Sequence, residues 1–248
     1  SLKSLTQTAL TRLEGDIASI EVMAQRRTVI CGSQQPLIDQ LQSLLDDCRR
    51  FGTLAFSHAA RAGFVATTLL KAMEAQGVLS NQRLQEFLKS FNTVAGDFED
   101  AKRSYANGTL SGADLIENFG HLRPGTYDIT VQAYWENPEQ YLFTDVEHIV
   151  DSCSEFVFLD NEQKGMQTLL DELGSSISVE DLIQYLVDAI KAREFVKFEF
   201  TKNLSKALDR IVTLCEGFGL AREDAAFLTT DDLRLLKTNR ISADLLDR

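Results

Sequence analysis

Cysteine is scarce in this chain, and its scarcity limits the class of protein. The 248 residues include four cysteines (Cys31, Cys48, Cys153 and Cys215), which are far apart and form no Cys-x-x-Cys pair. Four scattered cysteines are too few for a fold built on disulfide bonds, so we expect reduced thiols inside a cell. We therefore expect a cytoplasmic protein.

Long apolar runs and an excess of basic residues are also absent. No apolar run approaches the length of a membrane span, and no signal-peptide pattern opens the chain. The 25 Lys and Arg residues are outnumbered by 37 Asp and Glu residues, which gives a net charge of −12. Such an acidic chain is repelled by nucleic-acid phosphates. We expect neither nucleic acid nor a membrane among the partners.

The familiar motifs of catalytic and cofactor sites are missing as well. The sequence contains no Gly-x-Ser-x-Gly, Walker or dinucleotide-binding glycine pattern. Its three histidines (His58, His121 and His148) have no second ligand at the spacing of a helical metal site. We therefore predict no catalytic residue, no metal ligand and no cofactor within this chain.

What the sequence does contain is helical periodicity along most of its length. Apolar residues recur every three or four positions, which is typical of amphipathic helices. Ser80, Ser111 and Ser178 stand where N-caps are expected. The predicted helices cover the first twenty residues, 36 onward, 51–77, 80–107, 111–119, and about forty residues from 178 with a kink or break near 201–203. The expected fold is an all-α multi-helix bundle.

One long segment, from about residue 120 to 143, interrupts the helices. It holds Pro124, Pro138 and the only tryptophan, Trp135, together with three of the five tyrosines. Long loops in compact domains are often functional. The alternative is that these aromatic residues only plug the ends of the bundle.

The interruption also suggests how the chain is organised. We predict an N-terminal helical subdomain, 1–130, that ends in the GHLRPGTYDI loop, and a C-terminal helical subdomain, 131–248. The chain begins with Ser1 and enters helical periodicity at once. We therefore expect a fragment of a larger multidomain protein.

Several stretches resemble one family of enzymes. They are "NFGHLRPGTYDIT" in the loop, "HAARAGFVATTLLKAMEAQGVLS" upstream of it and "AREFVKFEFTKNLSKALDRIVTLCEGFGLAREDAAFL" downstream. Together they are similar to the central helical region of phosphoenolpyruvate synthase-like and pyruvate phosphate dikinase-like phosphotransferases, a group that includes rifampicin phosphotransferase. The resemblance covers about residues 50–230.

This resemblance implies a role for the chain within a larger enzyme. In that family an ATP-grasp domain splits ATP, with Mg²⁺, and a swivelling domain carries the phosphoryl group on a histidine to an acceptor. Neither domain is recognisable in this sequence. The chain is thus expected to be the acceptor-side central domain, with the ATP-grasp and phosphohistidine domains of the same chain and a small-molecule acceptor as partners. Alone it should be inactive. The alternative is a non-catalytic helical interaction or linker module.

The string "FSHAA", residues 56–60, resembles the sequence around the family's phosphorylated histidine. In the family a glycine-rich loop precedes that histidine and places it at an exposed helix start. Here His58 lies several residues inside a helical pattern and no Gly-Gly pair precedes it. We therefore interpret His58 as a structural residue.

Two groups of residues are candidates for substrate binding. The first is His121, Arg123, Tyr127 and Asp128 in the loop, where Arg123 has the donors to hold a phosphate or carboxylate and His121 can relay a proton. The alternative is that Arg123 and Asp128 pair with each other. In the rifampicin phosphotransferase branch of the family, the motif that this loop resembles has an Arg directly after the His and an acidic residue after the later Gly. This chain has Leu122 and Thr126 at those positions. That departure argues against an antibiotic acceptor.

The second candidate group is a basic helical face with Arg193, Glu194, Lys197, Lys202 and Asn203, of which Arg193, Lys197 and Asn203 are predicted to bind substrate. Arg193 and Lys197 are four residues apart and so share one face, and Glu194 can pair with Lys197. In an acidic chain such a face is suited to an anionic substrate or a phosphorylated partner. The alternative is an ordinary surface of ion pairs.

Overall fold

A computed structural model describes residues 2–91, 94–125, 127–144 and 156–237. Within these ranges every regular element is helical, and the predicted all-α fold is confirmed. The elements are α1 (Leu2–Cys31), α2 (Leu37–Asp47), the π-helix η1 (Cys48–Gly52), α3 (Thr53–Ala75), α4 (Asn81–Lys89), α5 (Val94–Ala106), α6 (Gly112–Phe119), the 3-10 helix η2 (Tyr134–Glu136), α7 (Pro138–Tyr141), α8 (Asp160–Glu172), α9 (Val179–Gly217), α10 (Arg222–Ala225) and α11 (Thr230–Lys237).

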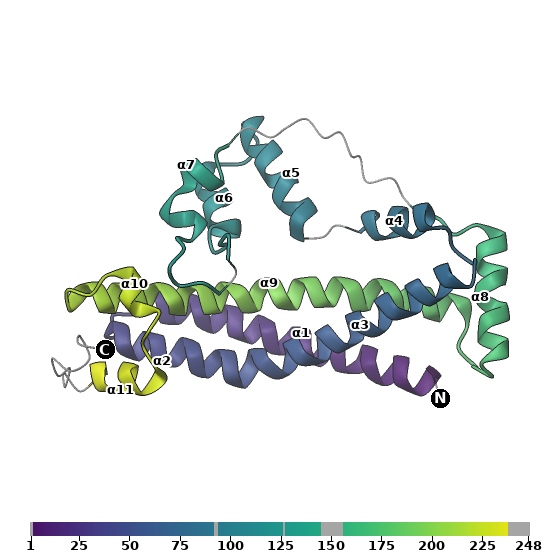
Figure 1. The fold of residues 1–248 in the computed structure, drawn as a ribbon, viewed down its shortest axis with the longest axis horizontal. Coiled ribbons are helices and arrows are strands. Elements are labelled where there is room, and N and C mark those ends of the chain that lie inside the picture. Colours follow the sequence, from purple (N-terminus) through teal and green to yellow (C-terminus); the bar gives the residue numbers. More distant parts are fainter. Residues whose placement is uncertain (1, 92–93, 126, 145–155, 238–248) are drawn as a thin grey trace.

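The centre of the molecule is an elongated bundle. Helix α9 runs along its length and packs against α1, α2 and α3 (Figure 1). Alanines at positions 55, 59, 62 and 66 place a strip of small buried residues on α3. Small side chains let helix backbones approach closely, while larger residues such as Met23, Leu186 and Val196 fill the core around them. Residues far apart in the chain thus build one core.

Helix α9 differs from its prediction because it has no break. It continues without interruption through residues 201–203, where a kink was expected. The polar side chains there are accommodated inside the helix and the bundle: the Thr201 hydroxyl donates to the carbonyl oxygen of Phe198, and Asn203 is fully buried. No proline lies in α9 to remove a backbone hydrogen bond.

The predicted helix over 80–107 is instead two helices, α4 and α5. The Ser90 hydroxyl donates to the carbonyl oxygen of Phe87, and such bonds compete with continuation of a helix. Phe91 is buried beside Phe87, with ring centroids 4.7 Å apart. Phe91, two residues after the end of α4, is thus part of the main core.

The N-cap predictions are confirmed at all three serines. The side-chain oxygens of Ser80, Ser111 and Ser178 accept hydrogen bonds from the backbone amides three residues later. Each bond satisfies one of the free donors at a helix start. These caps fix where α4, α6 and α9 begin.

The π-helix η1 joins α2 to α3, so that residues 37–75 form one helical rod. Gly52 is the last residue of η1, and a Cβ on it would lie 2.5 Å from Cδ2 of Phe200 in α9. Glycine is therefore required for this close approach of the rod to α9.

A second, smaller cluster lies over α9. Leu115, Phe119 and Leu142 form its centre, and Tyr134 stacks on Tyr141 with ring centroids 4.7 Å apart. In Figure 1, α5, α6 and α7 form an arch above α9, whereas α8 lies at one end of the bundle. The aromatic residues of the loop thus pack beside the bundle within this arch. The division at residue 130 stays a prediction, and the main core includes both Leu13 and Val196 from its two sides.

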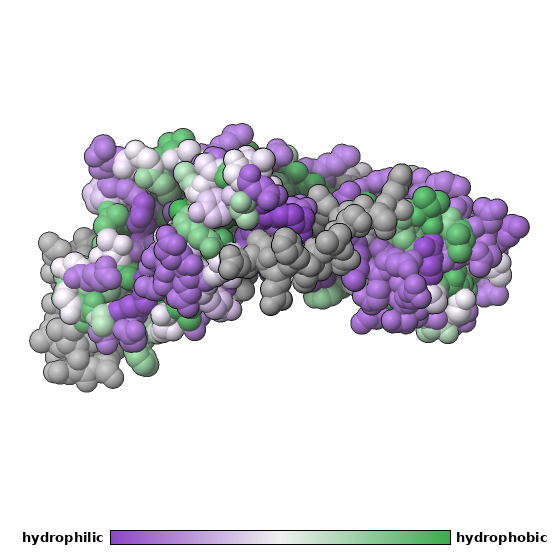
Figure 2. All heavy atoms as spheres, turned by 90° about the horizontal axis from the view of Figure 1, so that it is seen from above, coloured by the Kyte–Doolittle hydropathy of each residue, from purple (hydrophilic) through white to green (hydrophobic). Residues whose placement is uncertain are grey.

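The outer surface is largely polar. Seen from above, hydrophilic residues cover most of the face, and hydrophobic residues form separate patches (Figure 2). Among the described residues, no helix combines the length and apolar character needed to span a bilayer.

Candidate functional site

The loop after α6 is closed on itself and lies against α9. The Tyr134 amide donates to the carbonyl oxygen of Leu122 at 2.9 Å, and the Trp135 amide donates to that of Gly120 at 2.9 Å. The hydrogen bonds hold the two arms of the loop together. They fix the backbone around His121 and Arg123, two of the residues predicted to bind substrate.

His121 is buried, and no hydrogen bond of normal geometry reaches its ring nitrogens, although the Asn118 backbone is close enough to act on its pKa. Its side chain packs edge-on against the Phe198 ring, with centroids 4.6 Å apart, and neither ring nitrogen has a hydrogen-bond partner. Burial lowers the pKa of His121 to about 3, and Lys202, Arg27 and Lys206 add to this effect, while the Asn118 backbone opposes it. A buried imidazole with both nitrogens unpaired is uncommon in folded proteins.

The imidazole lines a cavity of about 350 Å³ that lies between α1, α6, α9 and the loop after α6. The cavity is lined by Arg27 and Cys31 on α1 and by Lys202 and Lys206 on α9, each pair one helical turn apart, and by Glu117 of α6 and His121 of the loop. Thr28, Ile116, Asn118 and Trp135 complete the wall. The cavity therefore combines three cationic side chains, one carboxylate, a thiol and a neutral imidazole.

Two of the cations share a single carboxylate. Arg27 lies 2.8 Å and Lys202 lies 2.7 Å from oxygens of Glu199. Burial by itself would raise the pKa of Glu199, but hydrogen bonds from Lys202 and Arg27 outweigh it and the pKa is lowered. Two positive charges and one negative charge leave one positive charge in excess on this wall.

Lys206 adds a third positive charge. Its ammonium lies 3.5 Å from the centroid of the Trp135 ring. Burial lowers the pKa of Lys206, whereas Asp209 and Cys31 oppose that change. No described carboxylate makes a salt bridge with Lys206, and the three cations meet two carboxylates, Glu117 and Glu199, so one positive charge remains in excess and suits an anion.

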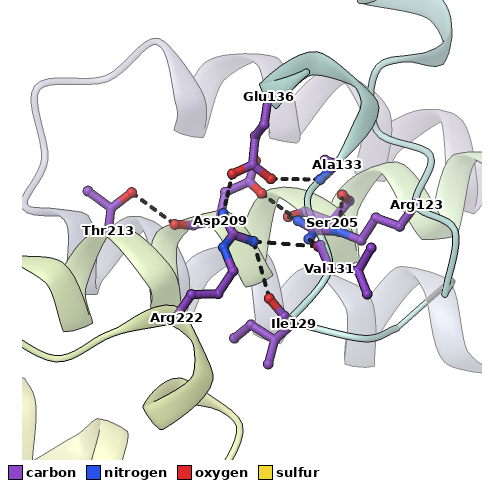
Figure 3. A network of polar contacts seen from close by, with 9 residues as sticks. All are labelled: Arg123, Ile129, Val131, Ala133, Glu136, Ser205, Asp209, Thr213 and Arg222. Carbon is purple, nitrogen blue, oxygen red and sulfur yellow. Dashed lines mark hydrogen bonds and ion pairs between the residues drawn. The ribbon is translucent and has the colours of Figure 1, made fainter. Parts of the chain in front are cut away.

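Arg123 is not among the residues that line the cavity and instead belongs to a polar network with Ser205 and Asp209 (Figure 3). Its guanidinium donates to Asp209 Oδ1 at 2.5 Å, to Ser205 Oγ at 3.1 Å and to the Val131 carbonyl oxygen at 2.5 Å. The side chain is 0% exposed. Arg222 joins the network through Glu136 and the Ile129 carbonyl oxygen.

The proposed pairing of Arg123 with Asp128 does not occur. Asp128 instead accepts hydrogen bonds from the amide and hydroxyl of Thr130, which makes a local turn. The carboxylate that faces Arg123 is Asp209, 86 residues later on α9. Tyr127 is 49% exposed. Of the four loop candidates, only His121 is part of the cavity wall.

The candidates on α9 do not form one site. Arg193 lies 3.5 Å from Glu194 and its guanidinium is over the Phe64 ring, so Glu194 pairs with Arg193 where pairing with Lys197 was expected. Lys197 is exposed. Asn203 is buried and donates to the Leu44 carbonyl oxygen and to Cys48 Sγ. The fold brings neither Arg193 nor Asn203 to the cavity.

His58 lies within α3 and faces α1. Its Nδ1 lies 3.1 Å from Oδ2 of Asp16. This contact ties the two helices together and agrees with a structural role. No group of three His, Cys, Asp or Glu side chains suited to a metal ion occurs among the residues that the structure describes.

Sequence reasoning missed several residues of the cavity. Arg27 and Cys31 on α1 and Lys206 on α9 had no motif around them, although each lies four residues from another cavity residue. That spacing places two side chains on one helical face but does not indicate which faces meet. Comparison of the chain with protein-family models, curated proteins and solved structures finds no match.

Proposed function

We propose that this chain is the acceptor-side helical domain of a multidomain ATP-dependent phosphotransferase, and that the cavity beside His121 holds the small acceptor. The observation that carries the proposal is the buried imidazole, unpaired at both nitrogens, in a cavity with three cations. The loop that supplies His121 is also one of the stretches that resemble the phosphoenolpyruvate synthase-like enzymes.

The cations of the cavity are suited to a phosphoryl group. Phosphoryl transfer depends mainly on positioning and on stabilising the charge of the phosphoryl oxygens. Lys202 and Lys206 lie one turn apart on α9 and Arg27 comes from α1, so an oxyanion in the cavity would contact positive charge from two helices. Nucleotide and Mg²⁺ would be bound by other domains, and we assign no ligand for them here.

His121 would act as the general base for the hydroxyl group of the acceptor. A neutral imidazole can accept the hydroxyl proton through one nitrogen. With its pKa at about 3, the imidazole by itself is too weak a base at neutral pH. A bound phosphoryl dianion would offset the charges of Lys202, Arg27 and Lys206 and would raise that pKa. The base would thus become effective only when the charged group is in place.

A cytoplasmic location belongs to the same proposal. Cys31, Cys48 and Cys215 are free thiols in the structure, which suits a reducing compartment.

The first test measures whether the cavity binds an oxyanion. His121 is followed by NMR as pH is varied, with and without millimolar inorganic phosphate. We expect phosphate to raise the pKa of His121 by about one unit or more. The Lys206→Met variant should reduce this shift, and Lys197→Met, an exposed position on the same helix, should not. If phosphate leaves the titration of His121 unchanged in the unaltered chain, the cavity is not an oxyanion site.

The second test separates phosphotransfer from simple binding. With ATP, Mg²⁺ and candidate acceptors, this chain alone should yield no phosphorylated product. In the parent enzyme, His121→Asn should slow transfer to the acceptor by about a hundredfold, while ATP-dependent loading of the phosphohistidine proceeds normally. A parent reading frame with no ATP-grasp region and no phosphohistidine region would leave the alternative, a non-catalytic helical interaction module.

A further inference from the structure

We propose that Cys31 is a modification site at which a low-molecular-weight disulfide bearing carboxylates forms a mixed disulfide and blocks the cavity. The inference concerns control of the cavity, and it rests on the proposed function where it identifies the blocked site as the acceptor site.

The position of Cys31 gives its thiol access to the cavity. Cys31 is the last residue of α1, it is partly exposed, and it lines the cavity together with Arg27, which lies one turn earlier. The Cys31 charge is one of the influences that raise the pKa of Lys206, so the two side chains are within electrostatic reach. A carboxylate-bearing reagent would thus be attracted to the side of the thiol.

A second observation points to a ligand at the same place. His121 is 3% exposed, lines the same cavity and has no partner at either ring nitrogen. Cavities of about 300–1,000 Å³ commonly hold small molecules, and this one measures about 350 Å³. Peptide amide and carboxylate groups of a bound disulfide would supply partners to His121 and Lys206.

The other described cysteines are poor competitors. Cys48 and Cys215 are buried, and burial raises the pKa of both thiols. A thiol must be both accessible and deprotonated to attack a disulfide. Cys153 lies outside the described residues, so modification must be located by peptide mapping.

The chemistry is a simple exchange. The Cys31 thiolate attacks one sulfur of the small disulfide, and a new sulfur–sulfur bond forms as the original one breaks. The departing thiolate takes up the proton that Cys31 lost. One disulfide replaces another, so the small disulfide is the only oxidant needed. A reducing thiol reverses the reaction.

The first experiment uses glutathione disulfide as the probe. The whole chain is incubated with it, and the adduct is located by peptide mass spectrometry. We expect the adduct on Cys31, loss of the phosphate effect on His121, and recovery of both after treatment with dithiothreitol. An adduct confined to Cys153, or no adduct, would overturn the inference.

The second experiment tests the part played by the cations. Cys31 is modified in parallel with anionic dithiobis(nitrobenzoate) and with neutral dithiodipyridine. The rate with the anionic reagent divided by the rate with the neutral reagent should fall about fivefold in Lys206→Met and stay unchanged in Lys197→Met. The neutral reagent reports accessibility, so partial unfolding would increase both rates and would not imitate this result. An unchanged ratio in Lys206→Met would refute the role of the cavity charge.

The outcomes distinguish this inference from the proposed function. If phosphate shifts His121 but Cys31 is not modified, only the inference about Cys31 fails. If Cys31 is modified with the expected charge preference but phosphate has no effect on His121, only the proposed function fails.

Discussion

Replacement of Arg123 by methionine tests whether this residue is a structural support of the loop. Methionine keeps the length and apolar character of the stem but removes every hydrogen bond of the guanidinium. The side chain is fully buried and pairs with Asp209, which is 17% exposed. Loss of one partner from a buried ion pair leaves an uncompensated charge and costs about 3–5 kcal/mol. We expect a loss of this size in the free energy of unfolding at pH 8.

The cost should depend on pH because Asp209 can be neutralised. Burial raises the pKa of Asp209 from 3.8 to about 6, against the opposing effects of Arg123 and Lys206. A folded-state pKa above the unfolded value means that the stabilising contribution is present below about pH 4 and is lost as pH rises through 6. That rise of about two units corresponds to about 3 kcal/mol. Without Arg123, the pKa of Asp209 should rise further.

The destabilisation by Arg123→Met should therefore be smaller at pH 5 than at pH 8. At pH 5 Asp209 is largely protonated in both proteins, and the remaining cost, about 2 kcal/mol, comes from the lost bonds to Ser205 and Val131. Asp209→Asn in the variant should recover much of the additional loss at pH 8. Because both proteins share all other titrating groups, their difference isolates this pair.

Urea unfolding at the two pH values measures these differences. Arg49→Met is a suitable control, because Arg49 forms an exposed pair with Asp46 and should cost no more than about 0.5 kcal/mol. The role given to the buried pair would be refuted if Arg123→Met were equally destabilised at pH 5 and pH 8. A urea midpoint of Arg123→Met no lower than that of Arg49→Met would refute it as well.

Four further substitutions test the packing of the bundle and the N-cap of α9. Gly52→Ala should destabilise by about 1–3 kcal/mol, because its Cβ would lie 2.5 Å from the Phe200 ring, whereas Gly15→Ala on an exposed part of α1 should stabilise by about 0.5–1 kcal/mol; thermal melts of both variants decide. Ser178→Ala removes the N-cap of α9 and should cost about 1 kcal/mol in urea unfolding, with no change in the phosphate effect on His121. Asn203→Ala leaves a cavity and unpaired groups beside η1 and should cost about 2 kcal/mol; an unchanged melting temperature would contradict a structural role.

The helices were predictable from the sequence because their signals are local. Serine caps and apolar periodicity depend only on neighbouring residues, and they located the starts of α4, α6 and α9. The predictions of helix ends and breaks were wrong where contacts between helices outweighed the local preferences of the sequence. Phe91 is buried in the stretch between α4 and α5, and α9 is unbroken at Asn203, whose buried amide bonds to the rod at Leu44. Neither contact can be read from nearby sequence.

The candidate site was predictable only in part for the same reason. The composition of the loop singled out His121, but its neighbours in the cavity come from helices about ninety residues before it and eighty after it. No local pattern marks Arg27 or Lys206 as members of a site. The partner of Arg123 was likewise expected nearby at Asp128, whereas the fold supplies Asp209.

His121 and Arg123 divide two tasks within one short stretch: Arg123 anchors the loop, and His121 lines the cavity of the proposed acceptor site. Arg123 engages Ser205 and Asp209, which are one turn apart on α9, while His121 lies in the cavity with Lys202 and Lys206, which are one turn apart on the adjacent strip of the same helix. The two loop residues therefore face neighbouring strips of α9. Anchoring Arg123 fixes the position of the loop along the helix, and that position brings the His121 imidazole to the two lysines. Arg123 is accordingly a positioning residue for the cavity.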